Sequence, residues 1–159
     1  MGDPLATYLE DHIAGASYAI DLLGAIRDQH AGEPLAEFAL GMLAEVKADE
    51  AALKGLAERV GSEVSSLKIA SAWLTEKVSR LKLSHESAGG LGTFQALEFL
   101  AVGIQGKLAL WRALAVASAG DDRLNQMDFD HLARRAESQH ARMETQCLEA
   151  ARTVFRRAQ

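Results

Sequence analysis

Apolar residues recur at intervals of three and four along most of the chain, which is the spacing of one helix face. The first run begins at Asp3-Pro4, where an aspartate can cap free backbone amides and a proline suits the first turn. It stops before Gly32-Glu33-Pro34, where glycine permits a left-handed helix end and proline opens the next helix. Its apolar positions are Leu5, Leu9, Ile13, Ala16, Ile20, Leu23 and Ile26. The first two helices should therefore be antiparallel neighbours.

The second helix is predicted from Pro34 to Gly61, where glycine ends it. Its apolar positions are Leu35, Phe38, Met42, Val46, Leu53, Leu56 and Val60. A shorter amphipathic helix follows, capped by Ser65 or Ser66. Its apolar positions are Leu67, Ile69, Trp73, Leu74, Val78 and Leu81. Residues 84–92 are polar and carry three glycines, so they are predicted to form a loop.

Two further helices complete the pattern. The one over residues 93–118 is apolar on most faces, which implies deep burial. After a turn at Gly120-Asp121-Asp122, Asp128 can cap the last helix. The inward positions predicted for that helix are Phe129, Leu132, Ala136, His140, Met143, Cys147, Ala151 and Val154.

These elements predict an all-α fold and a single domain over residues 1–159. Each long helix has roughly 25–29 residues and a length of about 37–44 Å, and rods of matched length pack as a bundle. The connection of about 30 residues between the second and third long helices is too long for a tight turn. We therefore expect its short helix to run back along the bundle as a crossover.

Composition and charge narrow the class of protein. The chain is 48% apolar and 25% charged, which suits a globular domain. The net charge of −5 argues against non-specific nucleic-acid binding. A basic last helix and an acidic first half can pair in a dimer or bind an anion, although a solvated helix face is the favoured interpretation. The longest apolar region, residues 94–119, is interrupted by polar residues, so no membrane span is expected. A lone cysteine, Cys147, and the absence of a secretory pattern favour the cytoplasm.

The four matched helices, the long crossover and the run Glu137-Ser138-Gln139-His140 resemble the ferritin-like superfamily. Di-iron members of that family carry Glu on helices one and three and Glu-x-x-His on helices two and four. Residues three apart share a helix face, so such a carboxylate and imidazole can meet one metal ion. The resemblance implies a ferritin-like bundle with a site for iron or manganese between the helices.

Heights along the bundle test the remaining ligand positions. With helices one and four running one way and two and three the other, Ala16, Asp49 and His140 share a layer about 17–18 Å from one end. Helix three passes this layer near Gln105, which is a poor substitute for a bridging carboxylate. The family's ligand set is therefore thinned, and the metal candidates that remain are Asp49, Glu137 and His140. A second, less favoured register brings in His12 or Glu98 as additional ligands.

Each candidate also has a structural interpretation. A buried carboxylate is costly unless it is paired, so Asp49 is predicted either to bind metal or to pair with Arg112, Lys107 or a histidine. For Glu98 the ion pair is favoured. For His12 and His140 a packed histidine is favoured over a ligand, with Asp49 or Glu144 as hydrogen-bond partners of His140.

Three functions remain open at this point. The favoured hypothesis is a ferritin-like bundle without a complete di-iron centre, which acts as a homodimeric structural or interaction module. The second is an iron- or manganese-dependent redox protein with its site between helices two and four. The third resembles the three-histidine zinc bundles of DNA-damage-inducible type, which are enzymes, and draws on His12, His30, His85, His131 and His140. No catalytic residue is assigned, and whether the chain is an enzyme is left open.

Overall fold

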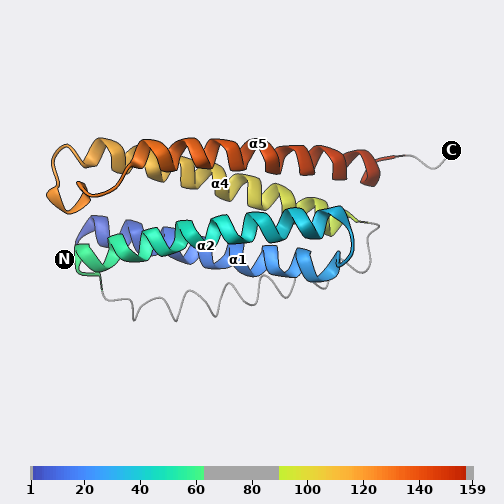
Figure 1. Ribbon diagram of the computed structural model, residues 1–159, viewed down its shortest axis with the longest axis horizontal. Helices are drawn as coiled ribbons and strands as arrows, with labels where there is room; N and C mark the ends of the chain where they lie inside the picture. Colours follow the sequence, from blue (N-terminus) through green and yellow to red (C-terminus); the bar gives the residue numbers. More distant parts are fainter. Residues whose placement is uncertain (1, 63–89, 157–159) are drawn as a thin grey trace.

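The computed structural model describes residues 2–62 and 90–156, and this part of the chain is helical without any strand (Figure 1). The long helices are α1 (Pro4–Gln29), α2 (Pro34–Val60), α4 (Leu91–Ala117) and α5 (Phe129–Val154). A 3-10 turn, η2 (Asp122–Leu124), precedes α5. The all-α class and the four long helices are therefore confirmed. The short crossover helix predicted near residues 67–81 lies outside the described residues.

Local capping chemistry sets four of the eight ends of the long helices. The side chain of Asp3 accepts from the Leu5 amide, and that of Asp128 accepts from the His131 amide. Gly61 ends α2 in the left-handed conformation, with φ of 81°, as predicted. Helix α4 begins at Leu91, two residues earlier than predicted, because Gly90 with φ of 89° already makes the turn into the helix.

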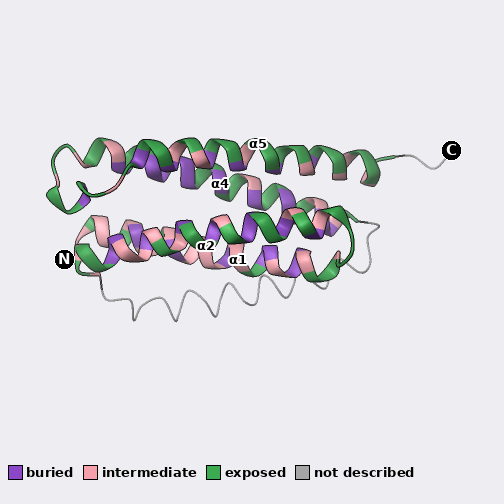
Figure 2. Ribbon diagram, in the orientation of Figure 1, coloured by how far each residue is buried: buried purple, intermediate pink, exposed green. Residues whose placement is uncertain are grey.

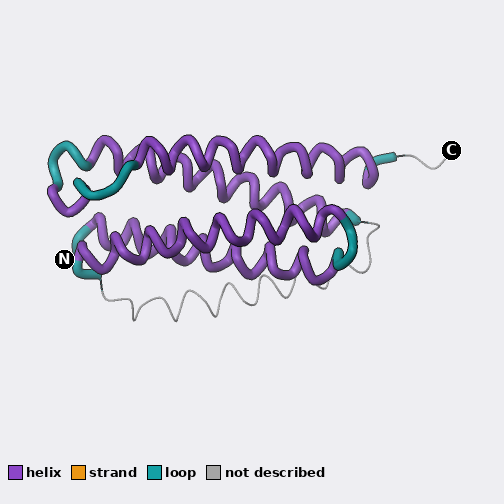
Figure 3. The backbone as a smooth tube through the Cα atoms, in the orientation of Figure 1, coloured by secondary structure: helices purple, strands orange, loops and turns teal. Residues whose placement is uncertain are grey.

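The four helices form two antiparallel pairs. Helix α1 packs against α2, α4 packs against α5, and α1 also contacts α4. In Figure 1, α1 and α5 run in one direction while α2 and α4 run in the other. Figure 3 shows a short connection between α1 and α2, and a longer one that contains η2 between α4 and α5. Helices α2 and α4 are therefore parallel, and α2 ends at the opposite end of the bundle from the start of α4.

The core consists of two apolar clusters, one toward each end of the bundle. One cluster includes Leu22, Leu23, Ile26, Met42, Val46, Leu97, Leu100, Ile104, Met143 and Cys147. The other includes Leu9, Ile13, Leu53, Leu56, Leu108, Trp111, Leu114, Phe129 and Leu132. Figure 2 shows the buried residues as stripes along the facing sides of the helices. The layer between the clusters carries the polar residues described below.

Helix α4 departs from two expectations. Deep burial was predicted, yet only one face of α4 is covered, and Phe99, Val102 and Val116 are 50%, 72% and 79% exposed. By length and composition Leu91–Ala117 is apolar enough to cross a membrane, despite the polar residues that interrupt it, and 39% of its most apolar window is buried. A core helix of a soluble bundle meets the same criterion, so this is weak evidence for a membrane.

Candidate functional site

A buried polar cluster joins three helices between the two apolar halves of the core. Asp49 of α2, Lys107 of α4 and Gln139 of α5 are 1%, 9% and 0% exposed. The Lys107 ammonium donates to Asp49 Oδ2 and to Gln139 Oε1, each at 2.5 Å. The Gln139 amide donates to Asp49 Oδ2 at 3.2 Å. Each of these three buried side chains therefore has a partner, as the apolar surroundings require.

Two arginines of α5 extend the cluster toward solvent. Arg135 donates to Asp49 Oδ1. Arg142 holds Glu45 through two parallel bonds of 2.9 and 2.7 Å, and Gln139 donates to the same carboxylate at 3.0 Å. These contacts link α2 to α5 side by side. We refer to Glu45, Asp49, Lys107, Arg135, Gln139 and Arg142 as the polar cluster.

The charges of the polar cluster do not cancel. It holds three cations and two carboxylates, and the Nε of Arg135 is buried without a partner among the described residues. Burial lowers the pKa of Lys107, and the neighbouring carboxylate of Asp49 opposes that shift. The bonds from Arg142 lower the pKa of Glu45. The polar cluster therefore carries one formal positive charge in excess when its three cations are protonated.

Asp49 lies where the sequence placed it, inside the bundle and in the predicted layer. Its partner Lys107 is one of those predicted for the ion-pair interpretation. Arg135 was not predicted as a partner. Both carboxylate oxygens of Asp49 accept from cationic side chains in this arrangement. A metal role for Asp49 stays a prediction.

The motif on α5 is turned by one position relative to expectation. Gln139 takes the buried place predicted for His140, which is half-buried and borders a shallow depression with Val102 and Gly106. Glu137 is exposed and binds Arg112 at 2.6 Å. No hydrogen bond among the described residues joins His140 to Asp49 or to Glu144. Asp49, Glu137 and His140 therefore do not converge in this arrangement.

The other candidate ligands are also apart. Glu98 is exposed, and the half-buried His12 stacks edge-on against Tyr8 with 4.8 Å between ring centroids. His30 contacts Thr93 Oγ1 at 3.0 Å, His131 is exposed, and His85 lies outside the described residues. Within residues 2–62 and 90–156, no three His, Cys, Asp or Glu side chains are placed to hold one metal ion.

Sequence reasoning missed Gln139 and the central position of Lys107. The available signal was a lysine in the middle of an apolar helix, opposite an aspartate that interrupts an apolar stripe. Two buried side chains of opposite charge are expected to pair with each other.

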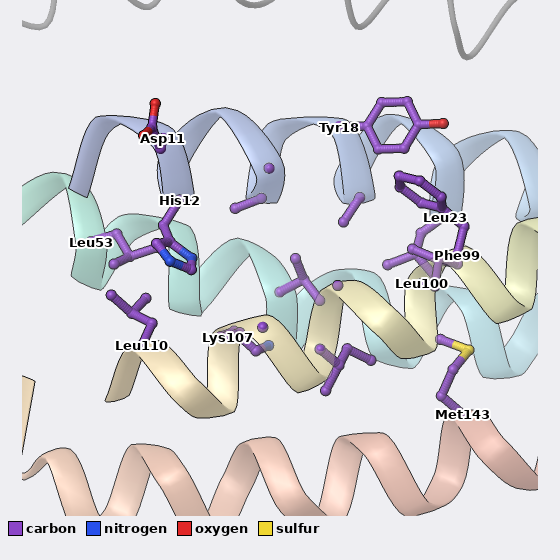
Figure 4. A pocket seen from close by; sticks show the side chains of 17 residues that line it. Asp11, His12, Tyr18, Leu23, Leu53, Phe99, Leu100, Lys107, Leu110 and Met143 are labelled. Atoms are coloured by element: carbon purple, nitrogen blue, oxygen red, sulfur yellow. The ribbon is translucent and has the colours of Figure 1, made fainter. Parts of the chain in front are cut away.

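A cavity of about 300 Å³ lies beside the polar cluster, between α1 and α4 (Figure 4). Apolar side chains line most of it, together with Gly15, Gly103 and Gly106. Lys107 lies near its middle and His12 near one end, where the ring points toward Leu53 and Leu110. The lining chains at the other end are Tyr18, Leu23, Phe99, Leu100 and Met143.

Burial shifts the pKa values of His12, which lines the cavity, and of Cys147 in the core. Burial lowers the pKa of His12, so its imidazole is neutral near pH 7 and keeps one N–H donor. Burial raises the pKa of the Cys147 thiol, with Glu98 and Glu144 adding to the effect. Cys147 is therefore a packed thiol rather than an activated nucleophile.

The comparisons with known proteins add no family. No family model, no curated protein and no solved structure matches this chain.

Proposed function

We propose that this chain is a ferritin-like bundle in which a protein-borne ion pair takes the place of the di-iron centre, and that it works as a homodimeric interaction module. The direction of the helices supports the first part of the proposal. Helices α2 and α4 run parallel, which is the relative direction expected of the second and third long helices of a ferritin-like bundle. The crossover itself falls within residues that the structure does not describe.

The polar cluster carries this proposal. In the di-iron arrangement, carboxylates from neighbouring helices converge in a central layer and attract metal cations. Here the corresponding layer holds the Lys107 ammonium and the Arg135 guanidinium around Asp49. Two resident cations repel a divalent ion, and they engage the carboxylate that the ion would need. The layer is suited to hold the helices in register rather than to perform redox chemistry.

The uncovered face of α4 supports an interaction role. Phe99, Val102 and Val116 expose apolar surface that a monomer in water would normally bury or replace with polar residues. Glu98 and Arg112 lie on the same exposed side, seven residues before and seven after Gln105. In an antiparallel contact of two α4 helices centred on Gln105, each Glu98 would lie opposite an Arg112, whose guanidinium would be shared with Glu137 of its own copy. This charge complementarity favours a second copy as the occupant.

The metal part of the proposal is tested by elemental analysis of protein purified without chelators. Iron, manganese and zinc should each fall well below one equivalent. One equivalent of iron or manganese that is lost in Asp49→Asn and in His140→Ala would overturn the proposal in favour of the redox hypothesis. One equivalent of zinc lost on removing His12, His30 or His140 would instead favour the three-histidine enzyme.

The dimer part is tested by light scattering of the same preparation. The full chain should have twice the mass of one copy, and Val102→Asp on α4 should halve it. Leu148→Asp is the matched control, because Leu148 on α5 is 57% exposed and lies outside the proposed contact. A monomeric wild-type chain, or a dimer that persists in Val102→Asp, would contradict this interface.

A further inference from the structure

Three glycines border the cavity between α1 and α4. Gly15 belongs to α1, and Gly103 and Gly106 belong to α4. A Cβ atom added at any of the three would have no neighbouring atom within 4 Å. These glycines therefore do not serve close packing of the two helices, which is the common reason for glycine at a helix contact. All three are exposed, so the open space beside them continues into solvent at the mouth of the cavity.

The size and lining of this space match a small amphipathic molecule. Ligand pockets in proteins begin at roughly 300 Å³ and are mostly apolar with a few placed polar groups. The cavity of about 300 Å³ is at the lower end of this range, which suits a small molecule. The end formed by Leu23, Phe99 and Met143 suits a hydrocarbon tail.

The polar lining favours an anionic head. The polar cluster, of which Lys107 borders the cavity, has one more cation than carboxylates. An ammonium has three donors, and the hydrogen bonds of Lys107 to Asp49 and Gln139 account for two. His12 offers a further N–H donor on the other side. Asp11 also borders the cavity, but Figure 4 shows its carboxylate directed to the outer side of α1.

We infer that the cavity binds a medium-chain carboxylic acid. Its carboxylate lies between Lys107 and His12, and its chain extends toward Leu23, Phe99 and Met143. The ligand cancels the excess positive charge of the polar cluster and fills space that the glycines leave open. This inference goes beyond the proposed function, because it depends neither on the oligomeric state nor on the family.

The test is calorimetric titration of the full chain with octanoate, which has ten non-hydrogen atoms, and with octan-1-ol, which has the same tail without the charge. Octanoate should bind one per chain, at least tenfold more tightly than octanol. Lys107→Met should weaken octanoate at least tenfold and leave octanol unchanged. Equal affinity for the two probes in the wild-type chain would overturn the anionic assignment even if Lys107→Met does not fold.

The location of the site is tested by filling it. Gly103→Leu places a side chain in the cavity and should abolish binding of both probes. Gly41→Leu is the matched control, since Gly41 is an exposed helical glycine of α2 with open space around it, and it should bind as the wild type does. No binding by the wild-type chain, or undiminished binding by Gly103→Leu, would overturn the inference.

Discussion

The bundle is closed differently along its two opposite seams. Between α2 and α5, charged side chains meet at hydrogen-bonding distance, with Glu45 held by Arg142 and Asp49 by Arg135. Between α1 and α4, small residues face one another and leave a cavity. Lys107 touches both regions, because its ammonium reaches Asp49 while its side chain borders the cavity.

This difference separates two uses of a bundle interior. Buried ion pairs add little net stability over well-packed apolar groups, but they tolerate few alternative registers because each charge needs its partner. An apolar seam with missing bulk forfeits dispersion contacts and leaves binding space. We therefore interpret the α2–α5 seam as the part that fixes the helices and the α1–α4 seam as the part open to function.

The largest expected effect comes from removing a charged partner from the α2–α5 seam. Asp49→Ala leaves Lys107 and Arg135 without their carboxylate, so the free energy of unfolding should fall by about 3–5 kcal/mol. Urea denaturation followed by circular dichroism measures the loss. Glu137→Ala is the control, because the exposed pair of Glu137 with Arg112 should contribute about 0–1 kcal/mol. Equal losses in the two variants would contradict the special role of the polar cluster.

Truncation of the apolar core on either side of this layer should have the next largest effect. Leu23 borders the cavity and is 1% exposed, while Leu108 belongs to the other apolar cluster and is 4% exposed. Leu23→Ala and Leu108→Ala should each lower the free energy of unfolding by about 2–5 kcal/mol. Thermal and urea unfolding of the two variants provide the measurement. Unchanged midpoints in both would mean that the assigned helix faces are wrong.

The stability of the chain should depend on pH through the Glu45–Arg142 pair of the α2–α5 seam. Arg142 lowers the pKa of Glu45 in the folded chain below its ordinary value of 4.5. Glu45 therefore binds a proton more readily in the unfolded chain than in the folded one. Its contribution to the free energy of unfolding is fully present above pH 4.5 and is lost as the pH falls through the lowered pKa of the folded chain. Melting temperatures measured from neutral to acidic pH should decline less steeply in Glu45→Gln. A steeper decline in the variant would show that the folded chain does not lower the pKa of Glu45.

Much of the architecture is predictable because helix periodicity and capping are local properties. Asp3, Asp128 and Gly61 act where the sequence places them, and the Asp49 layer lies between two apolar halves as the heights along the bundle suggest. The side chains within that layer were harder to predict. One residue turns a helix by about 100°, so Gln139 points inward where His140 was expected.

Helix α4 shows a second reason for this limit. When apolar residues lie on all sides of a helix, the spacing of apolar positions does not indicate which side faces the core. Lys107 looked like an interruption of an apolar run, and only the position of Asp49 across the bundle identifies it as a buried partner. The exposed face bearing Phe99 and Val102 was hidden by the same ambiguity. Pairings between distant helices are therefore the information that one sequence does not supply.

The smallest expected effect concerns a glycine of the α1–α4 seam. Gly103→Ala adds a methyl group that meets no atom within 4 Å, so helix propensity should raise the free energy of unfolding by about 0.5–1 kcal/mol. Gly61→Ala is the contrasting variant: Gly61 has φ of 81° at the end of α2, and a Cβ there should cost about 1–2 kcal/mol. Urea unfolding of both variants gives the comparison. If Gly103→Ala destabilises the chain as Gly61→Ala does, then α1 and α4 approach more closely than the cavity requires. A gain at Gly103 and a loss at Gly61 would instead support the assignment of the α1–α4 glycines to open space rather than to backbone geometry.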